Sequence, residues 1–305
     1  MIIQQIAKSS GIEASYLRTI VSTASHRYKI YKIPKKTGGE REIHHPSREL
    51  KYLQRWLVDN VFAYLPVHEA VFSYRDGKSI RDLAKKHANS RYMLRLDFAS
   101  FFPSIVGSDV VRLLKNNVGS VPISLTTHDL MDIRNIVCRF GRLTIGAPSS
   151  PVISNAILFE FDNYIYSKCK QIGIRYTRYA DDLIFSSQKT GVLSRVEADV
   201  IAALKHLPGP KLAINDKKTV FSSGKNRRKV VGLVITSEKK ISIGRDKKRY
   251  VKSLVYKYIN GILSADELVY LRGYLAFVNS VEPEFLAMLS AKYGSDKIRL
   301  ITHPV

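Results

Sequence analysis

The sequence predicts an α+β fold, because segments with strand alternation and segments with helical spacing both occur along its 305 residues. Strand alternation is seen over 28–33 and 40–45, and helical spacing of apolar residues over 47–64. Two short segments are strand-like: 94–97, which ends in the carboxylate of Asp97, and the apolar run 183–185, which follows Asp181 and Asp182. With 45% apolar residues the chain can bury a full core, so we expect one multi-lobed protein.

The first 23 residues show helical periodicity that Gly11 interrupts, which predicts two short helices. Ala7, Gly11 and Leu17 stand where a helix-turn-helix places its small, turn and core residues. A DNA-binding regulator built on residues 3–23 is therefore an alternative function. Short helix pairs with an intervening glycine are also common in proteins that read no DNA.

The segment 28–45 predicts a hairpin whose Lys35-Lys36-Thr37-Gly38-Gly39 turn is basic. Such a turn is also typical of an ordinary solvated loop. Further helices are expected over 79–87 and through most of 104–140.

The last third of the chain predicts one strand followed by helices. Residues 229–235 have the pattern of a buried strand that contains Gly232, and glycine in a strand often marks the close approach of another backbone. Helical spacing then returns over 250–262, 265–281 and 283–293, which predicts three helices.

Two adjacent carboxylates lie in Tyr179-Ala180-Asp181-Asp182, between two strand-like runs. Two unit charges about 4 Å apart repel by roughly 4 kcal/mol at an effective dielectric constant of about 20. A hard divalent cation would remove that cost. The alternative is an Asp-Asp turn that closes a hairpin and binds nothing.

A second acid, Asp97, ends an apolar strand, where a carboxylate is costly unless it is paired or bound to metal. Asp97 and Asp181 would supply the two carboxylates that hold two metal ions about 3.5 to 4 Å apart for phosphoryl transfer. Mg²⁺ prefers oxygen ligands and incomplete protein cages, so we expect two Mg²⁺ ions. The role of Asp182 is less direct, because neighbouring strand residues point to opposite faces.

The stretch Gly146-Ala147-Pro148-Ser149-Ser150-Pro151 predicts a turn that opens a helix, with Pro151 in its first turn. Exposed N–H groups and small side chains there would let a nucleotide or a nucleic-acid backbone approach closely. A helix start without any ligand explains the same pattern.

The net charge of +23 indicates a polyanionic partner, most simply nucleic acid. Between Lys211 and Lys257 only three acids oppose a dense basic series that includes Arg228, Arg245 and Arg249, and tyrosines that could stack on bases interleave with it. A solvated basic surface is the alternative. Cys138 and Cys169 match no metal-ligand spacing, and no apolar run approaches eighteen residues. We therefore expect a cytoplasmic protein without a membrane span or signal peptide.

Taken in order, five motifs resemble those of a reverse transcriptase, and bacterial retron reverse transcriptases most closely. They are Arg41-Glu42-Ile43, Asp97-Phe98-Ala99-Ser100-Phe101-Phe102, the Gly146–Pro151 stretch, Tyr179-Ala180-Asp181-Asp182 and Asn215-Asp216-Lys217-Lys218-Thr219. One departure is Ile145, which stands where reverse transcriptases generally carry Gln.

The resemblance implies a right-hand polymerase that makes DNA on an RNA template. Its expected parts are N-terminal helices and fingers over 1–91, a palm of antiparallel sheet and helices over 92–235 with a helical insertion at about 104–142, and a helical thumb over 236–305. A group II intron or diversity-generating reverse transcriptase shares these palm motifs and is an alternative.

The resemblance also implies site residues. The catalytic metal ligands would be Asp97, Asp181 and Asp182, with the Phe98 carbonyl. The incoming nucleotide would meet Lys36, Arg41, Ala99, Phe102, Ala147 and Lys218, and Phe102 would exclude the ribose 2′-hydroxyl. Lys218, or Lys217 beside it, would neutralise or protonate the leaving group. Primer and template would meet Gly146, Pro148, Ser149, Val231, Gly232, Leu233, Arg245, Lys248 and Arg249.

Retron resemblance further implies partners. These are deoxynucleoside triphosphates, one structured non-coding RNA encoded nearby, and its branched RNA–DNA product, which starts from the 2′-hydroxyl of an internal guanosine. A separate effector protein in anti-phage defence and a host ribonuclease H are expected as well.

Overall fold

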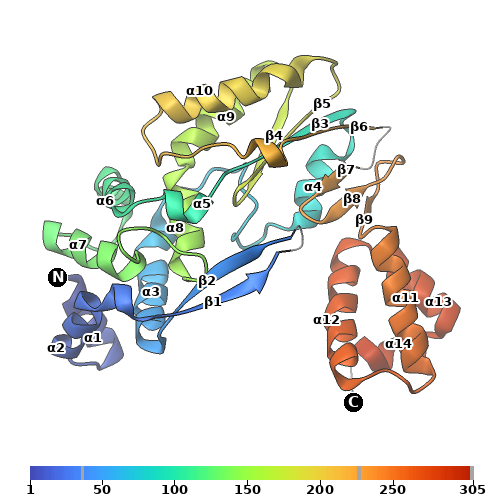
Figure 1. Ribbon diagram of the computed structural model, residues 1–305, viewed down its shortest axis with the longest axis horizontal. Coiled ribbons are helices and arrows are strands. Elements are labelled where there is room, and N and C mark those ends of the chain that lie inside the picture. The colour runs from blue at the N-terminus through green and yellow to red at the C-terminus, as the bar shows by residue number, and fades with distance from the viewer. Residues whose placement is uncertain (36–37, 225–227, 303–305) are drawn as a thin grey trace. The chain divides into compact units, whose positions relative to one another are not determined.

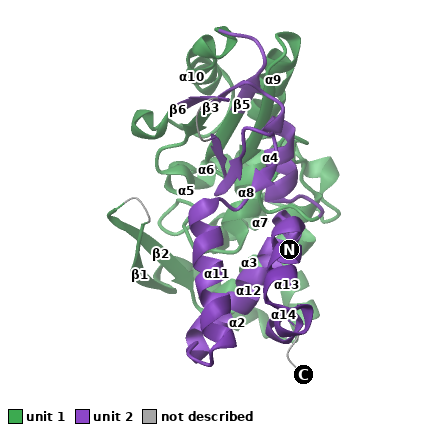
Figure 2. Cartoon of the chain, turned by 90° about the vertical axis from the view of Figure 1, so that its right-hand side faces the viewer, with its two compact units in different colours: residues 1–76, 95–184, 191–220 green, residues 77–94, 185–190, 221–305 purple. Residues whose placement is uncertain are grey.

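The computed structural model describes residues 1–35, 38–224 and 228–302 (Figure 1). The chain divides into two compact units, which Figure 2 colours separately. Unit 1 comprises residues 1–76, 95–184 and 191–220, and unit 2 comprises residues 77–94, 185–190 and 221–305. The expected boundaries of fingers, palm and thumb stay a prediction. No helix in the described ranges is long and apolar enough to cross a membrane.

The N-terminal helix pair forms as expected. Helices α1 (Ile2–Ser10) and α2 (Ala14–Ser22) are separated by Gly11. Gly11 ends α1 because it adopts the left-handed conformation, with a φ of 69°. Their apolar faces are buried, and both helices pack against α7 (Thr127–Val137). This face of the pair is therefore part of the core of unit 1.

The predicted hairpin is also present. Strands β1 (Tyr28–Pro34) and β2 (Glu40–Pro46) pair antiparallel, with Tyr28 opposite Pro46. Ser47 caps the following helix α3 (Arg48–Asn60) by accepting a hydrogen bond from the Leu50 amide. A short 3₁₀ turn, η2 (Phe62–Tyr64), ends this part.

Most of the expected insertion is helical. It contains α6 (Gly107–Asn116), η3 (Val118–Ser120) and α7, and the short helix α5 (Phe101–Ser104) directly precedes it. The helix expected after Pro148 is two helices, α8 (Ser149–Ile157) and α9 (Phe159–Gln171), because the backbone of Leu158 leaves helical geometry. Helix α10 (Val196–His206), preceded by η4 (Val192–Arg195), was not predicted.

The central sheet has four strands in the order β4-β5-β3-β6. These are β4 (Arg175–Tyr179), β5 (Asp182–Ser187), β3 (Tyr92–Asp97) and β6 (Val220–Ser223). In Figure 1 this sheet lies beside α9 and α10, and α9 packs against β4 and α10. Because β3 lies next to β5, the end of β3 is a neighbour of the β4–β5 turn.

Unit 2 contains α4 (Ile80–Ala88), a small antiparallel sheet and a helical bundle. Helix α4 packs against β8 (Leu233–Ile235) and β9 (Ile241–Ser242), which follow β7 (Arg228–Val230). The bundle is α11 (Arg245–Ile259), α12 (Ala265–Val281), α13 (Pro283–Tyr293) and α14 (Ser295–Thr302).

The sequence predicted three of these bundle helices and missed α14. Its segment is short and polar, and only Ile298 and Ile301 are buried in it. Packing against α12 and α13 rather than a long apolar stripe therefore stabilises this helix.

The expected strand through Gly232 is wrong. Val230 pairs with Leu233, so Val231 and Gly232 form a two-residue hairpin turn between β7 and β8. Their φ angles are 46° and 84°, and a turn with two positive φ angles suits the right-handed twist of paired strands. Val231 is a β-branched residue in the left-handed region, which is a strained conformation.

Replacing Val231 should therefore stabilise the protein. Asn adopts the left-handed region readily, so Val231→Asn should raise the free energy of unfolding by about 1 kcal/mol. Chemical denaturation measures this, with Val231→Ala as the control that keeps most of the backbone strain. A Val231→Asn variant no more stable than Val231→Ala would contradict the strain at this turn.

Candidate active site

The backbone joins the two predicted acidic segments. The Phe98 amide, directly after β3, donates a hydrogen bond of 3.0 Å to the Asp181 carbonyl. Asp181 lies in the two-residue turn between β4 and β5, where Ala180 has a φ of 54°. The Asn215 amide donates to the Asp97 carbonyl at 2.8 Å, which attaches a third predicted motif to the same strand end.

Asp97 and Asp181 are coupled electrostatically. The Asp97 side chain is buried, with 5% of the residue exposed. Burial raises the pKa of Asp181, and the negative charge of Asp97 raises it further. Lys218 Nζ lies 2.7 Å from Asp97 Oδ1, so Lys218 rather than Lys217 is the cation at the acids. Lys218 and Arg41 both oppose the rise in the pKa of Asp181.

Asp182 belongs to the same cluster but has a different neighbour. Burial raises its pKa to about 6, Asp181 and Asp97 add to the rise, and Arg95 opposes it. Arg95 Nε lies 3.9 Å from Asp182 Oδ1. Arg95 was not among the predicted site residues, although a basic residue two positions before Asp97 in an apolar strand is a usable signal.

The oxygen atoms at this site fit a hard divalent cation. Among the described residues, no three His, Cys, Asp or Glu side chains gather closely enough to bind a metal ion alone. Asp97 and Asp181 are two carboxylates whose repulsion a cation would relieve, and magnesium-type sites take their other oxygens from water and phosphate. Phe98 forms an antiparallel bridge with Ile214. The hydrogen bonds of this bridge run from the Ala99 amide to the Ala213 carbonyl and from the Asn215 amide to the Asp97 carbonyl, so the bridge does not use the Phe98 carbonyl.

A buried ion pair lies next to the turn that carries Asp181. Arg178 of β4 and Asp162 of α9 are both fully buried, and Arg178 Nη2 lies 2.6 Å from Asp162 Oδ2. Arg178 Nε donates to Asp162 Oδ1 at 2.8 Å, and the Tyr176 hydroxyl donates to the same oxygen at 2.7 Å. The Asp162 carboxylate is thus held by several donors inside unit 1.

This ion pair is connected to the turn through hydrogen bonds. Arg178 Nη1 donates to the Ala180 carbonyl at 3.2 Å and to Asn155 Oδ1 at 3.3 Å. Ser73 Oγ accepts a hydrogen bond of 2.8 Å from the Ala180 amide, and Asn155 Nδ2 donates to the Ser73 carbonyl at 2.9 Å. Ser73, Asn155, Asp162 and Arg178, here called the turn support, fix the residue that precedes Asp181.

Tyr74 is a further residue that the sequence analysis missed. Its φ is 53°, and its ring lies 6.5 Å from the ring of Tyr179. Burial raises the pKa of Tyr74, and Tyr179 and Asp181 add to the rise. Arg41 opposes it, which places the exposed side chain of Arg41 near Tyr74 as well as Asp181. Lys36 lies outside the described residues.

Comparison with known proteins identifies the family. Residues 33–235 match the family model described as reverse transcriptase (RNA-dependent DNA polymerase). The chain is 39% identical to the retron Ec83 reverse transcriptase of Escherichia coli over 91% of this chain and 90% of that one. It is 33% identical to the retron Ec86 reverse transcriptase of the same organism, over 97% and 92%. The chain belongs to the retron reverse transcriptases.

A solved structure supports the fold of this retron reverse transcriptase. Apo telomerase from Candida tropicalis matches with a TM-score of 0.54 at 13% identity, over 88% of this chain and 58% of that one. The α+β right-hand polymerase fold is therefore confirmed, as is RNA-directed DNA polymerase activity as the function. Reverse transcriptases use divalent metal ions and bind RNA templates, in agreement with the acidic cluster and the net charge. The family match includes the acidic strands, which a DNA-binding regulator would leave unexplained.

Phe102 is the least buried of three neighbouring rings in this reverse transcriptase. Phe98 and Phe101 stack at 5.6 Å and are both buried, whereas Phe102 is half-buried and lies 5.1 Å from Phe101. Ser100 has a φ of 47° and α5 begins at Phe101, so strand alternation does not apply to these residues. Phe102 as the sugar-selecting ring stays a prediction, and Ala99 beside it is half-buried.

The Gly146 segment contacts the hairpin. A Cβ atom on Gly146 would lie 2.8 Å from the His44 carbonyl oxygen, and the φ of Gly146 is 114°. The His44 amide donates to the Ile145 carbonyl at 2.8 Å. Close approach of β2 thus accounts for glycine here. Gly146 and Pro148 reach the surface, whereas Ala147 and Ser149 are buried, so a side-chain contact from Ser149 to nucleic acid is not open in this structure.

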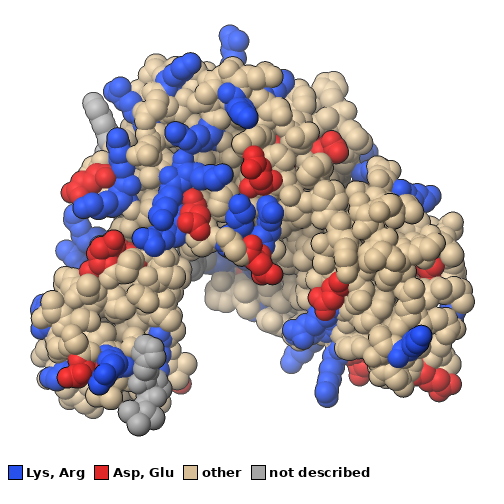
Figure 3. All heavy atoms as spheres, turned by 180° about the vertical axis from the view of Figure 1, so that it is seen from behind, with Lys and Arg blue, Asp and Glu red and all other residues tan. Residues whose placement is uncertain are grey.

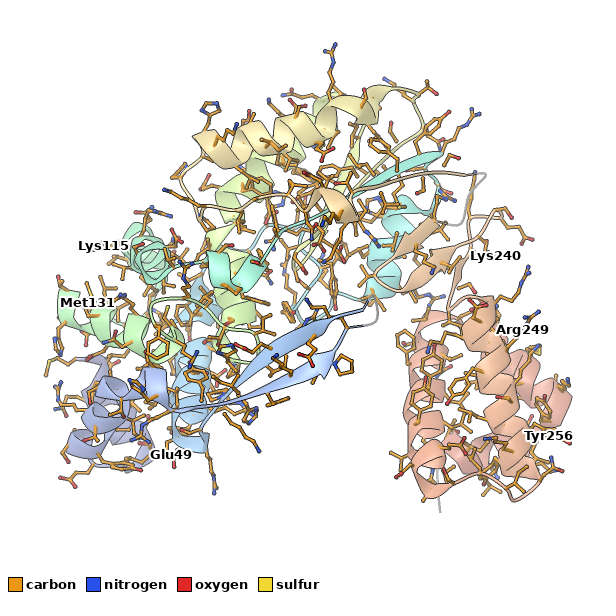
Figure 4. All side chains as sticks on the ribbon, in the orientation of Figure 1. Glu49, Lys115, Met131, Lys240, Arg249 and Tyr256 are labelled. Carbon is orange, nitrogen blue, oxygen red and sulfur yellow. The ribbon has the colours of Figure 1, made fainter. Side chains whose placement is uncertain are left out.

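The predicted primer and template residues of unit 2 differ in exposure. The Val231–Gly232 turn and the exposed side chains of Arg245 and Arg249 are accessible, and Figure 4 labels Arg249 on α11. Leu233 is buried. Lys248 forms an ion pair with Glu282 and lies 5.2 Å from the Phe285 ring. These roles stay predictions.

Arg228 does not belong to the exposed basic series in which the sequence placed it. It is 3% exposed and donates to the carbonyls of Ala88, Ser90 and Thr236, so its role is structural. On the face drawn in Figure 3, lysine and arginine side chains nevertheless outnumber acidic ones.

Removing the charge of Asp162 should destabilise the fold strongly. Asp162→Asn leaves the Arg178 guanidinium buried without a counterion, which typically costs about 3–5 kcal/mol. Urea denaturation measures the loss. The control is Asp199→Asn, which breaks the exposed 3.9 Å pair with Lys168 and should cost less than about 1 kcal/mol. Equal effects of both variants would contradict the role of the turn support.

Stability of the metal-free protein should depend on the ionisation of Asp182. Its pKa is about 6 in the folded protein against 3.8 ordinarily, so ionisation opposes folding and its cost grows as the pH rises between these values. Asp182→Asn should therefore raise the melting temperature at about pH 7, and the gain should vanish near pH 4. Thermal unfolding across pH measures this. A gain in melting temperature that is independent of pH would contradict the raised pKa of Asp182. A gain that excess divalent metal fails to reduce would contradict a place for Asp182 at the metal site.

Proposed function

We propose that this enzyme copies a structured non-coding RNA into DNA with two Mg²⁺ ions at Asp97 and Asp181. The observation that carries the proposal is the electrostatic coupling of the buried carboxylate of Asp97, at the end of β3, with the half-buried carboxylate of Asp181 in the β4–β5 turn, with Lys218 paired to Asp97. The retron names of its relatives support the choice of RNA and the branched RNA–DNA product. Asp182 and the Phe98 carbonyl are the additional ligand candidates.

Bound Mg²⁺ would lower the pKa of the priming hydroxyl and offset charge on the leaving pyrophosphate. The residues of the chain do the rest. Lys218, which pairs with Asp97, would neutralise the pyrophosphate, and Arg41 and Lys36 would supply positive charge for the triphosphate. The turn support holds Asp181 in a fixed position, so the acids need little reorganisation when substrate binds.

The partners follow from the same family relationship. We infer that deoxynucleoside triphosphates are the substrates and that a retron effector protein acts with this enzyme in anti-phage defence. Removal of copied RNA would fall to a host ribonuclease H. A reducing cytoplasm suits the two buried free cysteines, Cys138 and Cys169.

The catalytic assignment can be tested with Asp181→Asn. This variant removes one charge from the metal site, so extension of oligo(dT) on poly(rA) in Mg²⁺ should be abolished while RNA binding persists. Asp216→Asn, which changes an exposed acid next to Lys217, is the matched control and should extend normally. Near wild-type extension by Asp181→Asn would refute the assignment.

The sugar selection by Phe102 has its own test. Phe102→Ala should keep DNA synthesis but raise ribonucleotide incorporation, because steric exclusion of the 2′-hydroxyl acts through shape alone. The measurement is the ratio of kcat/KM for the two sugars. Phe102→Tyr retains a ring and should retain selection. An unchanged ratio in a folded Phe102→Ala variant would place the selecting group elsewhere.

A further inference from the structure

A basic hollow lies at the end of the β1–β2 hairpin that is away from its turn. It is open to solvent, has a volume of about 540 Å³ and lies where Tyr28 pairs with Pro46. None of its nine lining residues is acidic. Six of them carry basic or imidazole side chains: His26, Arg27, Lys29, His45, Arg48 and Lys51.

The nearby acids offset only part of the positive charge of this hollow. Glu49, which Figure 4 labels on α3, is fully exposed. Its pKa is lowered first by hydrogen bonds to its own backbone and Ser47, then by the charges of Arg27 and Arg48, so it opposes part of the charge of these two lining residues. Glu42 is hydrogen bonded to His44. The N-terminus of the 13-residue helix α3 adds partial positive charge. A concave surface with this excess of positive charge fits the phosphates of a nucleic acid.

An exposed aromatic ring adjoins the hollow. Phe140 is 59% exposed, although its φ of 46° places it in the strained left-handed region. The Arg139–Arg142 bridge makes Phe140 and Gly141 the tip of a tight turn. The edge of His26, a lining residue of the hollow, contacts this ring with centroids 5.4 Å apart.

Contacts with its neighbours fix the direction of this ring. The Arg139 guanidinium lies 4.6 Å from the ring centroid, and the Phe140 amide donates to Ser25 Oγ at 3.1 Å. Core packing does not account for a strained phenylalanine whose ring is mostly in solvent. Exposed rings beside cations are the usual platforms on which unpaired bases stack.

This surface is separate from the nucleotide end of the hairpin. His45, which lines the hollow, is four residues along β2 from Arg41, or about 13 Å at the rise of a strand. A nucleic-acid segment bound at the hollow would therefore occupy a different place from the incoming nucleotide near Asp181.

We propose that the basic hollow and Phe140 form a second nucleic-acid site, which holds the phosphates of a folded RNA and stacks one of its unpaired bases. The proposal rests on the proposed function, because a structured RNA is the partner that the enzyme would carry. It assigns to that RNA a docking surface outside the polymerase site.

Two variants test the site by different chemistry. Lys29→Gln/Arg48→Gln/Lys51→Gln removes phosphate contacts, and Phe140→Asn removes the ring while relieving the backbone strain. The control, Lys115→Gln/Lys170→Gln/Lys205→Gln, neutralises three exposed lysines elsewhere in unit 1, of which Figure 4 labels Lys115. The probe is a fluorescein-labelled RNA stem-loop with a single-stranded adenosine tail, titrated by anisotropy between roughly 50 and 200 mM salt.

The triple variant at the hollow should bind the probe about 10- to 100-fold more weakly than the control, with a salt slope smaller by about 2 to 3. Phe140→Asn should weaken binding about 5- to 100-fold, change the slope little and raise the melting temperature. Both should extend oligo(dT) on poly(rA) like the wild type.

Binding by both variants as tight as by the control would overturn the docking site and leave the surface to a partner other than nucleic acid. A lower melting temperature of Phe140→Asn would contradict the strain argument. Failure of the wild type to extend oligo(dT) would instead count against the proposed function, so the two failures are distinguishable.

Discussion

The buried pairing of Arg178 with Asp162 is the interaction on which the catalytic geometry depends. A guanidinium without solvent contact is tolerated only when its charge and its donors are satisfied, and here one carboxylate, one amide oxygen and two backbone carbonyls do so. One of these carbonyls belongs to Ala180. The requirement to satisfy a buried charge and the requirement to position Asp181 are thus met by the same contacts.

Unlike Asp162, the acids of the candidate metal site repel one another. Burial raises the pKa of Asp181 and of Asp182, and the charge of Asp97 adds to both rises. Lys218 and Arg41 oppose the rise at Asp181, and Arg95 and Lys218 oppose it at Asp182. The protein alone leaves this repulsion partly uncompensated, and a divalent ion would relieve it. A rigid turn that holds destabilised carboxylates is what a preorganised metal site requires.

Backbone strain is concentrated near the residues with proposed functions. Tyr74, Ser100 and Ala180 have positive φ angles around the acidic turn, and Phe140 and Val231 have them at the two exposed turns discussed above. Such conformations cost free energy and persist where surrounding contacts enforce them. At Ala180 the hydrogen bonds from the turn support are visible. At Phe140 the contacts of the ring with His26 and Arg139 leave most of the residue exposed.

The sequence by itself determined the family and the fold class, and it predicted Asp97 and Asp181 as metal ligands, because these depend on local patterns: an apolar run ending in a carboxylate, paired acids in a turn, and motifs in a fixed order. The hairpin and the helices α12 and α13 followed from periodicity for the same reason. Only the tertiary structure decided that Lys218 rather than Lys217 pairs with Asp97, that Arg228 is buried, and that Val231–Gly232 is a turn. It also brought Ser73, Asn155 and Asp162 to Arg178. These outcomes depend on which distant segments pack together, and the spacing of residues along one chain does not encode the partner of a buried charge.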